Sequence, residues 1–126
     1  MTTKKKRSNN TNYLIEAIKK WPNPIYDSRH GYYIFIEEGR ARTNETRIEH
    51  IVRKAHDLKV RDLELIPSYI NRYVVYKKDP VYKDTFNYYL NRKGQDKGFI
   101  KISVQLDHGN RSKGWIKTIY ITYKIK

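Results

Sequence analysis

The stretch GFIKISVQLD, residues 98–107, alternates apolar and polar side chains over the length of one β-strand. Ile100, Ile102, Val104 and Leu106 fall on one face, whereas Phe99, Lys101, Ser103 and Gln105 fall on the other. This period of two predicts a strand with one face on a core and one face open. The polar face then presents Lys101 and Ser103 to whatever lies above the sheet.

A second alternating run, WIKTIYITYKIK at residues 115–126, follows after the turn HGNRSKG. Its expected inner row is Ile119, Ile121 and Tyr123, and its outer row is Thr118, Tyr120 and Thr122. Two strands joined by one hairpin are expected to be neighbours, with directly opposed side chains about 5 Å apart. Lys101, Ser103, Thr118 and Tyr120 would then cluster on the open face. An ordinary solvated sheet face accounts for any one of them, but the cluster of four favours a binding site.

Working outward, RYVVYK and DTFNYYLNR add two more strand-length runs rich in aromatic and β-branched residues, separated by short turns. The earlier part of the chain predicts a helix from Asn10 or Thr11 to about Lys20, ended by PNP, then a strand over 32–38. Two further helices are expected over 44–56, capped by Thr43 or Asn44, and over 61–71, where Pro67 shortens or kinks the second.

These elements predict an α+β fold in which N-terminal helices pack on a C-terminal four-stranded antiparallel meander. The first helix and the strand at 32–38 are extra elements. Residues 1–10, with no apolar residue after Met1, are expected to form a disordered basic arm, and residues 11–126 a single domain.

The helix that includes TRIEHIVRKAH, residues 46–56, carries two histidines. Ile48, Ile51, Val52 and Ala55 share one side at helical spacing. His50 lies nearly opposite this stripe, beside Arg47 and Lys54, and His56 lies at its margin. This arrangement fits either a solvated basic face or a phosphate-facing ridge with a titratable imidazole. His50 reaches the open face of the sheet only if the helix lies at the edge of that sheet.

The charge of the chain narrows the class of partner. Among 126 residues, 27 Lys and Arg oppose 13 Asp and Glu, for a formal net charge of +14. Such an excess favours a polyanion: RNA, DNA or an anionic membrane surface. Cysteine is absent, which excludes disulfides and thiolate chemistry. Because no apolar run reaches membrane-spanning length and the N-terminus lacks a signal-peptide pattern, we expect a cytoplasmic protein.

The available side chains favour metal-free chemistry on RNA. The sequence has no HExxH motif, no acidic or histidine cluster at ligand spacing and no Gly-rich phosphate loop, so we expect neither a metal nor another cofactor. RNA cleavage through the 2′-hydroxyl needs only a base, an acid and cations that stabilise the developing charge. Histidine, lysine, arginine, tyrosine and threonine suffice for this reaction, although many non-catalytic RNA-binding proteins have the same composition.

The segments RTNETRIEHIVRKAHDLKVRDLELIP, KDTFNYYLNRKGQDKGFIKISVQL and WIKTIYITYKIK together resemble the phage- and plasmid-associated branch of the barnase–EndoU–colicin E5/D–RelE nuclease superfamily, known as the BECR fold. The resemblance runs from about residue 40 to the C-terminus. It rests on the HI pair of RIEHIVRKAH, the K-x-S of one middle strand and the T-x-Y of the last strand. It implies one or two helices ahead of a four-stranded antiparallel sheet.

The same resemblance implies a metal-independent endoribonuclease, a toxin or an effector of a mobile element. His50 would transfer a proton and Lys101 would stabilise the phosphate. Ser103 and Thr118 would bind phosphate oxygens, and Tyr120 would orient the nucleotide. The expected residues for nucleic-acid binding are Arg42, Arg47, Lys54 and Arg92. Expected partners are RNA, such as a tRNA or mRNA, and a cognate acidic immunity or antitoxin protein.

Two other functions stay open. A non-catalytic nucleic-acid-binding protein, such as a small phage or plasmid regulator, would use the helices at 44–56 and 61–71 as a helix-turn-helix pair, although four following strands and Pro67 disfavour that motif. Alternatively, the positive charge could serve an acidic protein partner, as in an immunity protein.

Overall fold

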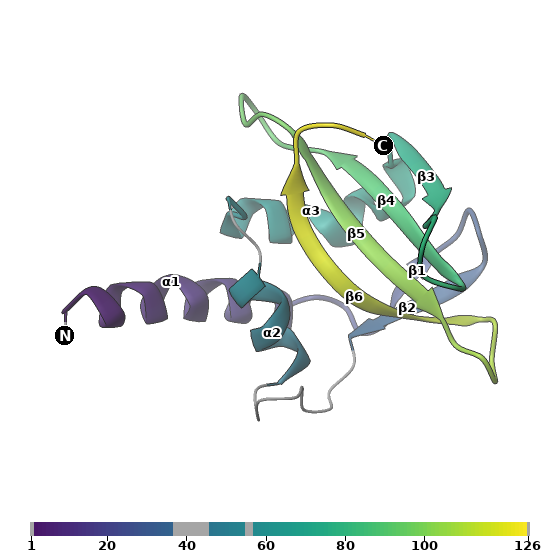
Figure 1. The fold of residues 1–126 in the computed structure, drawn as a ribbon, viewed down its shortest axis with the longest axis horizontal. Coiled ribbons are helices and arrows are strands. Elements are labelled where there is room, and N and C mark those ends of the chain that lie inside the picture. The colour runs from purple at the N-terminus through teal and green to yellow at the C-terminus, as the bar shows by residue number, and fades with distance from the viewer. Residues whose placement is uncertain (1, 37–45, 55–56, 126) are drawn as a thin grey trace.

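The computed structural model describes residues 2–36, 46–54 and 57–125, with the side chains of residues 2–10 outside the described part. Figure 1 shows helices on one side of a curled sheet, with α3 behind the sheet in that view. In chain order, the elements are α1 (Thr2–Lys19), β1 (Ile25–Asp27), β2 (Tyr32–Ile36), α2 (Arg47–Lys54), α3 (Val60–Tyr69), the 3₁₀ turn η1 (Ile70–Arg72), β3 (Val75–Lys78), β4 (Thr85–Asn91), β5 (Phe99–Leu106) and β6 (Lys113–Thr122).

The sheet has six strands in the order β1-β2-β6-β5-β4-β3. The predicted antiparallel meander is present as β3 to β6. The expectation of a four-stranded sheet needs correction, because β1 and β2 extend it beyond β6. Strand β2 pairs with β6 in parallel and with β1 antiparallel, so the complete sheet is mixed.

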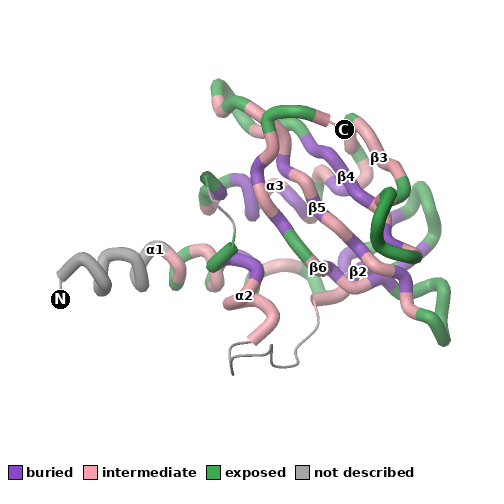
Figure 2. The backbone as a smooth tube through the Cα atoms, in the orientation of Figure 1, coloured by how far each residue is buried: buried purple, intermediate pink, exposed green. Residues whose placement is uncertain are grey.

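The alternation along β5 is confirmed: its residues are buried and half-buried in turn (Figure 2). Ile100, Ile102 and Val104 are fully buried and face a core shared with Leu63 and Ile66 of α3. Ile119 and Ile121 of β6 also belong to this core. Tyr123, expected on the same inner row, lies beyond the end of β6 and is 57% exposed, so that assignment was wrong.

Two predicted helix starts differ from the structure. Helix α1 begins at Thr2 rather than near Thr11, so its backbone includes the basic tract for which disorder was expected. Helix α2 is capped by Thr46, not by Thr43 or Asn44. The backbone N–H of Glu49 donates to the Thr46 hydroxyl over 3.2 Å, and the N–H of Thr46 donates to the Glu49 carboxylate over 2.7 Å. This reciprocal capping box fixes the start of the helix that carries His50.

Pro67 neither ends nor shortens α3, which continues to Tyr69. A proline within a helix has no N–H for the carbonyl four residues earlier, and here that carbonyl belongs to Leu63. The indole N–H of Trp21 donates to the Leu63 oxygen over 2.8 Å. The side chain that follows α1 therefore supplies the hydrogen bond that Pro67 removes from α3.

A β-bulge interrupts the pairing of β5 with β6. Ser103 is opposite Thr118, but the next residue, Val104, is opposite Ile116. Lys117 is therefore an extra residue without a counterpart on β5, which is the definition of a bulge. The bulge lets Ile116 and Ile119 both face the core, while Lys117 and Thr118 lie between them.

The role of Trp21 can be measured with a double-mutant cycle. Trp21→Phe should lower the free energy of unfolding by about 1–3 kcal/mol, because the Leu63 carbonyl loses its donor. Pro67→Ala restores a backbone N–H four residues after Leu63, so Trp21→Phe should cost about 1 kcal/mol less in that background. Urea unfolding of the four proteins gives the coupling energy. Equal costs in both backgrounds would show that the indole contributes packing alone.

The bulge predicts unequal effects for two single-residue deletions. Deleting Lys117 leaves Ile116, Thr118 and Ile119 in regular alternation, so the protein should fold with its thermal midpoint changed by only a few degrees. Deleting Ile119 also restores alternation, but it removes a buried side chain and moves the polar Thr118 to the core face in its place, so it should lower the midpoint severely or prevent folding. Circular dichroism melts compare the two. Equal damage from both deletions would contradict the assignment of Lys117 as the extra residue.

Candidate active site

A pocket of about 420 Å³ lies on the open face of the sheet, where α2, β5, β6 and the β3–β4 loop meet. All five predicted catalytic residues line it. The full lining is Arg47, His50, Asp79, Tyr82, Thr85, Lys101, Ser103, Gln105, Lys117, Thr118 and Tyr120. The strands β5 and β6 are neighbours, as their hairpin predicts, and the register places Lys101 opposite Tyr120 and Ser103 opposite Thr118.

The place of α2 beside the sheet brings His50 to this pocket. In the described part of the chain, β2 pairs with β6 only as far as Ile116. Helix α2 contacts β6 and lies to one side of it in Figure 1. Ile51 and Val52 of α2 are buried, so His50, on the opposite side of the helix, is half-buried beside the polar face of the sheet. Its Nδ1 lies 3.5 Å from the Arg53 guanidinium.

Lys101 supplies a fixed positive charge at the pocket. Its ammonium lies 5.3 Å from the ring centroid of Tyr120 and 5.8 Å from that of Tyr89. Burial acts to lower the pKa of Lys101. A hydrogen bond to the Tyr120 hydroxyl and the negative charge of Asp79 outweigh burial, so the pKa lies above its ordinary value. Lys101 is therefore suited to stabilising an anion rather than to releasing a proton.

Ser103 belongs to a hydrogen-bonded chain that the sequence did not indicate. Its hydroxyl donates to Asn87 Oδ1 over 2.7 Å, and Asn87 Nδ2 donates to Asp79 Oδ1 over 2.9 Å. The bond from Asn87 and backbone N–H groups of the β3–β4 loop lower the pKa of Asp79, which keeps it ionised. Since the Ser103 proton is used within this chain, Ser103 positions Asn87 here, and the expected donation to a phosphate oxygen would need its hydroxyl to rotate.

The ionised groups favour a bound anion. Arg47, Lys101 and Lys117 contribute three positive charges to the lining, against the single carboxylate of Asp79. Thr118 and Tyr120 add hydroxyl groups close to these cations. Cations and hydroxyl donors around a pocket of this size suit the non-bridging oxygens of a phosphodiester.

Lys117 and Asp79 are the main lining residues that sequence reasoning missed. Regular alternation places Lys117 on the inner face with Ile119, and only the bulge returns it to the open face. Asp79 lies in the short KDP turn, and long-range folding brings it opposite β5. No local sequence pattern predicts the position of Asp79. For Lys117 the one available signal is a lysine at an expected core position, which indicates a bulge.

Of the four predicted nucleic-acid-binding residues, Arg47 lines the pocket. Lys54 is exposed at the end of α2 and does not line it. Arg42 lies outside the described residues, as does His56. The fourth position, Arg92, needs a correction of its role.

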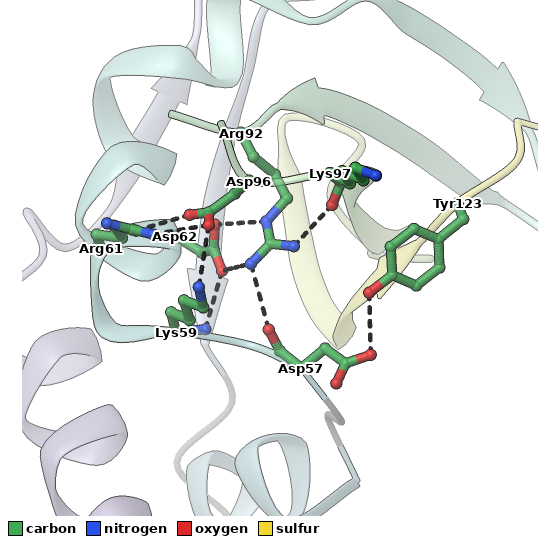
Figure 3. Close-up of polar contacts among 8 residues, drawn as sticks. All are labelled: Asp57, Lys59, Arg61, Asp62, Arg92, Asp96, Lys97 and Tyr123. Carbon is green, nitrogen blue, oxygen red and sulfur yellow. Dashed lines mark hydrogen bonds and ion pairs between the residues drawn. The ribbon is translucent and has the colours of Figure 1, made fainter. Parts of the chain in front are cut away.

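Arg92 is part of a buried ion pair at the start of α3 (Figure 3). Its guanidinium donates to both carboxylate oxygens of Asp62, over 3.0 and 2.8 Å, and to the backbone oxygen of Lys97 over 2.7 Å. The side chains of Arg92 and Asp62 are only 4% and 0% exposed. The hydrogen bond to Asp62 raises the pKa of Arg92. Arg92 therefore joins the end of β4 to α3 and is not placed to bind RNA.

A second polar cluster surrounds Asp27, which is the last residue of β1 and is fully buried. His30 Nδ1 lies 2.9 Å from Asp27 Oδ2, and the Tyr88 hydroxyl donates to the same oxygen. The His30 ring stacks on Tyr76 with centroids 3.7 Å apart. Ring packing holds His30 against Tyr76 of β3, and Asp27 joins His30 to Tyr88 of β4, so this cluster ties the β1–β2 turn to the sheet.

Within the described residues, no group of three or more His, Cys, Asp or Glu side chains is placed to hold a metal ion. No described helix has the length and apolar character needed to cross a membrane.

Comparisons of this chain with models of protein families, with curated proteins and with solved structures find no match. The resemblance to the BECR-fold nucleases therefore stays a prediction from the sequence.

Proposed function

We propose that this protein is a metal-independent endoribonuclease that cleaves RNA through attack of a 2′-hydroxyl on the adjacent phosphate. The observation that supports the proposal is the shared pocket of His50, Lys101, Thr118 and Tyr120, which come from three different elements. This reaction requires a group that transfers a proton, a cation and hydroxyl donors around one phosphate. The pocket brings together a histidine, a permanent cation and two hydroxyl groups.

In the proposed reaction, His50 accepts the proton of the 2′-hydroxyl while the 2′-oxygen bonds to phosphorus. The bond from phosphorus to the 5′-oxygen breaks, which leaves a 2′,3′-cyclic phosphate and a 5′-hydroxyl end. Lys101 and Lys117 stabilise the charge that develops on the phosphate oxygens. The Lys101 ammonium donates to the Tyr120 oxygen. The Tyr120 proton therefore stays available for the leaving 5′-oxygen.

A non-catalytic phosphate-binding protein could use the same cations, so the role of His50 separates the two functions. A non-catalytic protein that binds nucleic acid through a helix-turn-helix motif gains little support. The inner side chains of α3, Leu63 and Ile66, are buried in the core, and Arg61 on its exposed side is held by Asp96 over 2.6 Å. A cognate acidic inhibitor protein would bind at the cationic pocket, where its charge has its complement.

His50→Ala should lower the rate of RNA cleavage by roughly 10²–10⁴-fold while RNA affinity stays nearly unchanged, because a proton-transfer group acts mainly in the transition state. The cleavage rates are measured with bulk tRNA and with unstructured oligoribonucleotides. The affinity of His50→Ala for RNA is measured by binding and compared with that of the wild type. His108→Ala is the matched control, because His108 is 74% exposed in the β5–β6 loop and pairs there with Asp84. Lys101→Met should reduce both cleavage and binding.

Two substrate and solvent controls belong to this experiment. EDTA should leave the rate unchanged, and a 2′-deoxyribose at the scissile position should block cleavage because the nucleophile is missing. Equal cleavage by wild type and His50→Ala, or loss of activity in EDTA, would reject the mechanism. Binding without cleavage of any RNA tested would favour the non-catalytic function.

A further inference from the structure

The open face of the sheet continues from the pocket onto a row of aromatic side chains. Gln105, which lines the pocket, is paired with Trp115 of β6. Trp115 is paired in turn with Phe35 of β2. Farther out, Tyr33 of β2 is paired with Tyr26 of β1. We name Trp115, Phe35, Tyr33 and Tyr26 the aromatic row.

Burial shows that the aromatic row faces away from the core. The alternate residues of β2, Tyr32 and Ile34, are buried, and so are Ile25 and Asp27 on either side of Tyr26. Adjacent side chains of a strand point to opposite faces. Tyr26 and Tyr33 are therefore on the open face, where they are 46% and 45% exposed.

The rings of the aromatic row are in contact with one another and have a cation beside them. The centroids of Tyr26 and Tyr33 are 4.6 Å apart, and those of Phe35 and Trp115 are 5.4 Å apart. Lys113, paired with Tyr33, places its ammonium 5.5 Å from the Phe35 centroid. The Trp115 indole N–H donates to Asp107 over 3.2 Å, which fixes the orientation of its ring.

Contacts among these rings do not explain why two tyrosines stay nearly half exposed on the outermost strands of this sheet edge. Exposed aromatic side chains beside a cation are the arrangement with which proteins bind unpaired bases: the bases stack on the rings and the cation contacts the phosphates. The net charge of +14 and the cationic pocket at one end of the row favour a nucleic acid over a protein partner.

We propose that the aromatic row binds single-stranded RNA by base stacking and leads the strand into the pocket. This inference rests on the proposed ribonuclease function and names the substrate class. Neighbouring strands are about 4.8 Å apart, so the surface from β5 to β1 spans roughly 14 Å, enough for a short run of nucleotides beside the scissile phosphate. Duplex RNA should bind less well, because its bases are stacked on each other and offer no free faces.

Binding measured in the His50→Ala background tests the row without cleavage of the probe. Tyr33→Ala should weaken binding of an unstructured oligoribonucleotide by about 5-fold or more, since one stacked base is lost. Tyr33→Phe should bind normally, because stacking needs only the ring. Tyr13→Ala is the matched control: Tyr13 is 66% exposed but lies on α1. A duplex of the same sequence and an abasic oligomer of the same length should not distinguish Tyr33→Ala from its parent.

A second readout does not depend on the stability of an alanine variant. The protein has two tryptophans, Trp21 and Trp115. The oligoribonucleotide should quench the fluorescence of the parent protein, and Trp115→Phe, which retains only Trp21, should lose that quenching. Unchanged affinity in Tyr33→Ala together with quenching that persists in Trp115→Phe would overturn the inference. Equal losses of affinity in Tyr33→Ala for the single-stranded, duplex and abasic probes would also overturn it, because they would indicate binding by charge alone.

The two proposals fail in different ways. Cleavage that depends on His50 but not on Tyr33 would retain the ribonuclease and reject the aromatic row. Stacking that depends on Tyr33, without cleavage of any RNA, would reject the ribonuclease and make the row part of a binding protein.

Discussion

The pairing of β6 changes at Ile116, and the candidate site depends on that change. Up to Ile116 the strand has β5 on one side and β2 on the other. From there on, within the described residues, α2 lies beside it in place of a strand. The bulge at Lys117 occurs at the same point. A helix beside a sheet can present side chains above the sheet surface, which a further strand in the same plane could not do. His50 and Arg47 therefore line one pocket with Lys101 and Tyr120 because α2 lies beside this part of β6.

Local patterns predicted most of the fold. The alternation of Ile100, Ile102 and Val104 identified β5 and its buried face, and short turns identified the meander, because both signals lie within a few residues of chain. The parallel pairing of β2 with β6 joins residues about 80 positions apart in the register, and no local signal specifies such a contact. The prediction that Pro67 shortens or kinks its helix also missed a contact between residues distant in sequence. The cost of Pro67 to α3 is offset by Trp21, which is distant in sequence.

The residues of the candidate site that lie on β5 and β6 could be predicted from the sequence, whereas the contacts made by distant parts of the chain could not. Residue type and strand register placed Lys101, Ser103, Thr118 and Tyr120 together, and the structure adds His50. Sequence could not separate Arg47, at the pocket, from Arg92, in a buried pair with Asp62, because charge alone does not reveal which acid lies nearby. Nor could it show that Asn87 and Asp79 hold Ser103, since that chain forms only when the β3–β4 loop folds over β5. The BECR-like reading of these motifs stays a prediction.

The lengths of the outer strands have a consequence for how copies of this protein meet one another. The sheet ends in β1, with three residues, and in β3, with four. Short edges offer few unpaired backbone groups, so they are poor templates for a strand of a second molecule. The stretch of β6 beyond Ile116 would be a longer template, and α2 lies beside it. Local melting of α2 would thus do more than remove His50 from the pocket: it would uncover backbone of β6 capable of intermolecular pairing, so loss of the pocket and aggregation would share one cause.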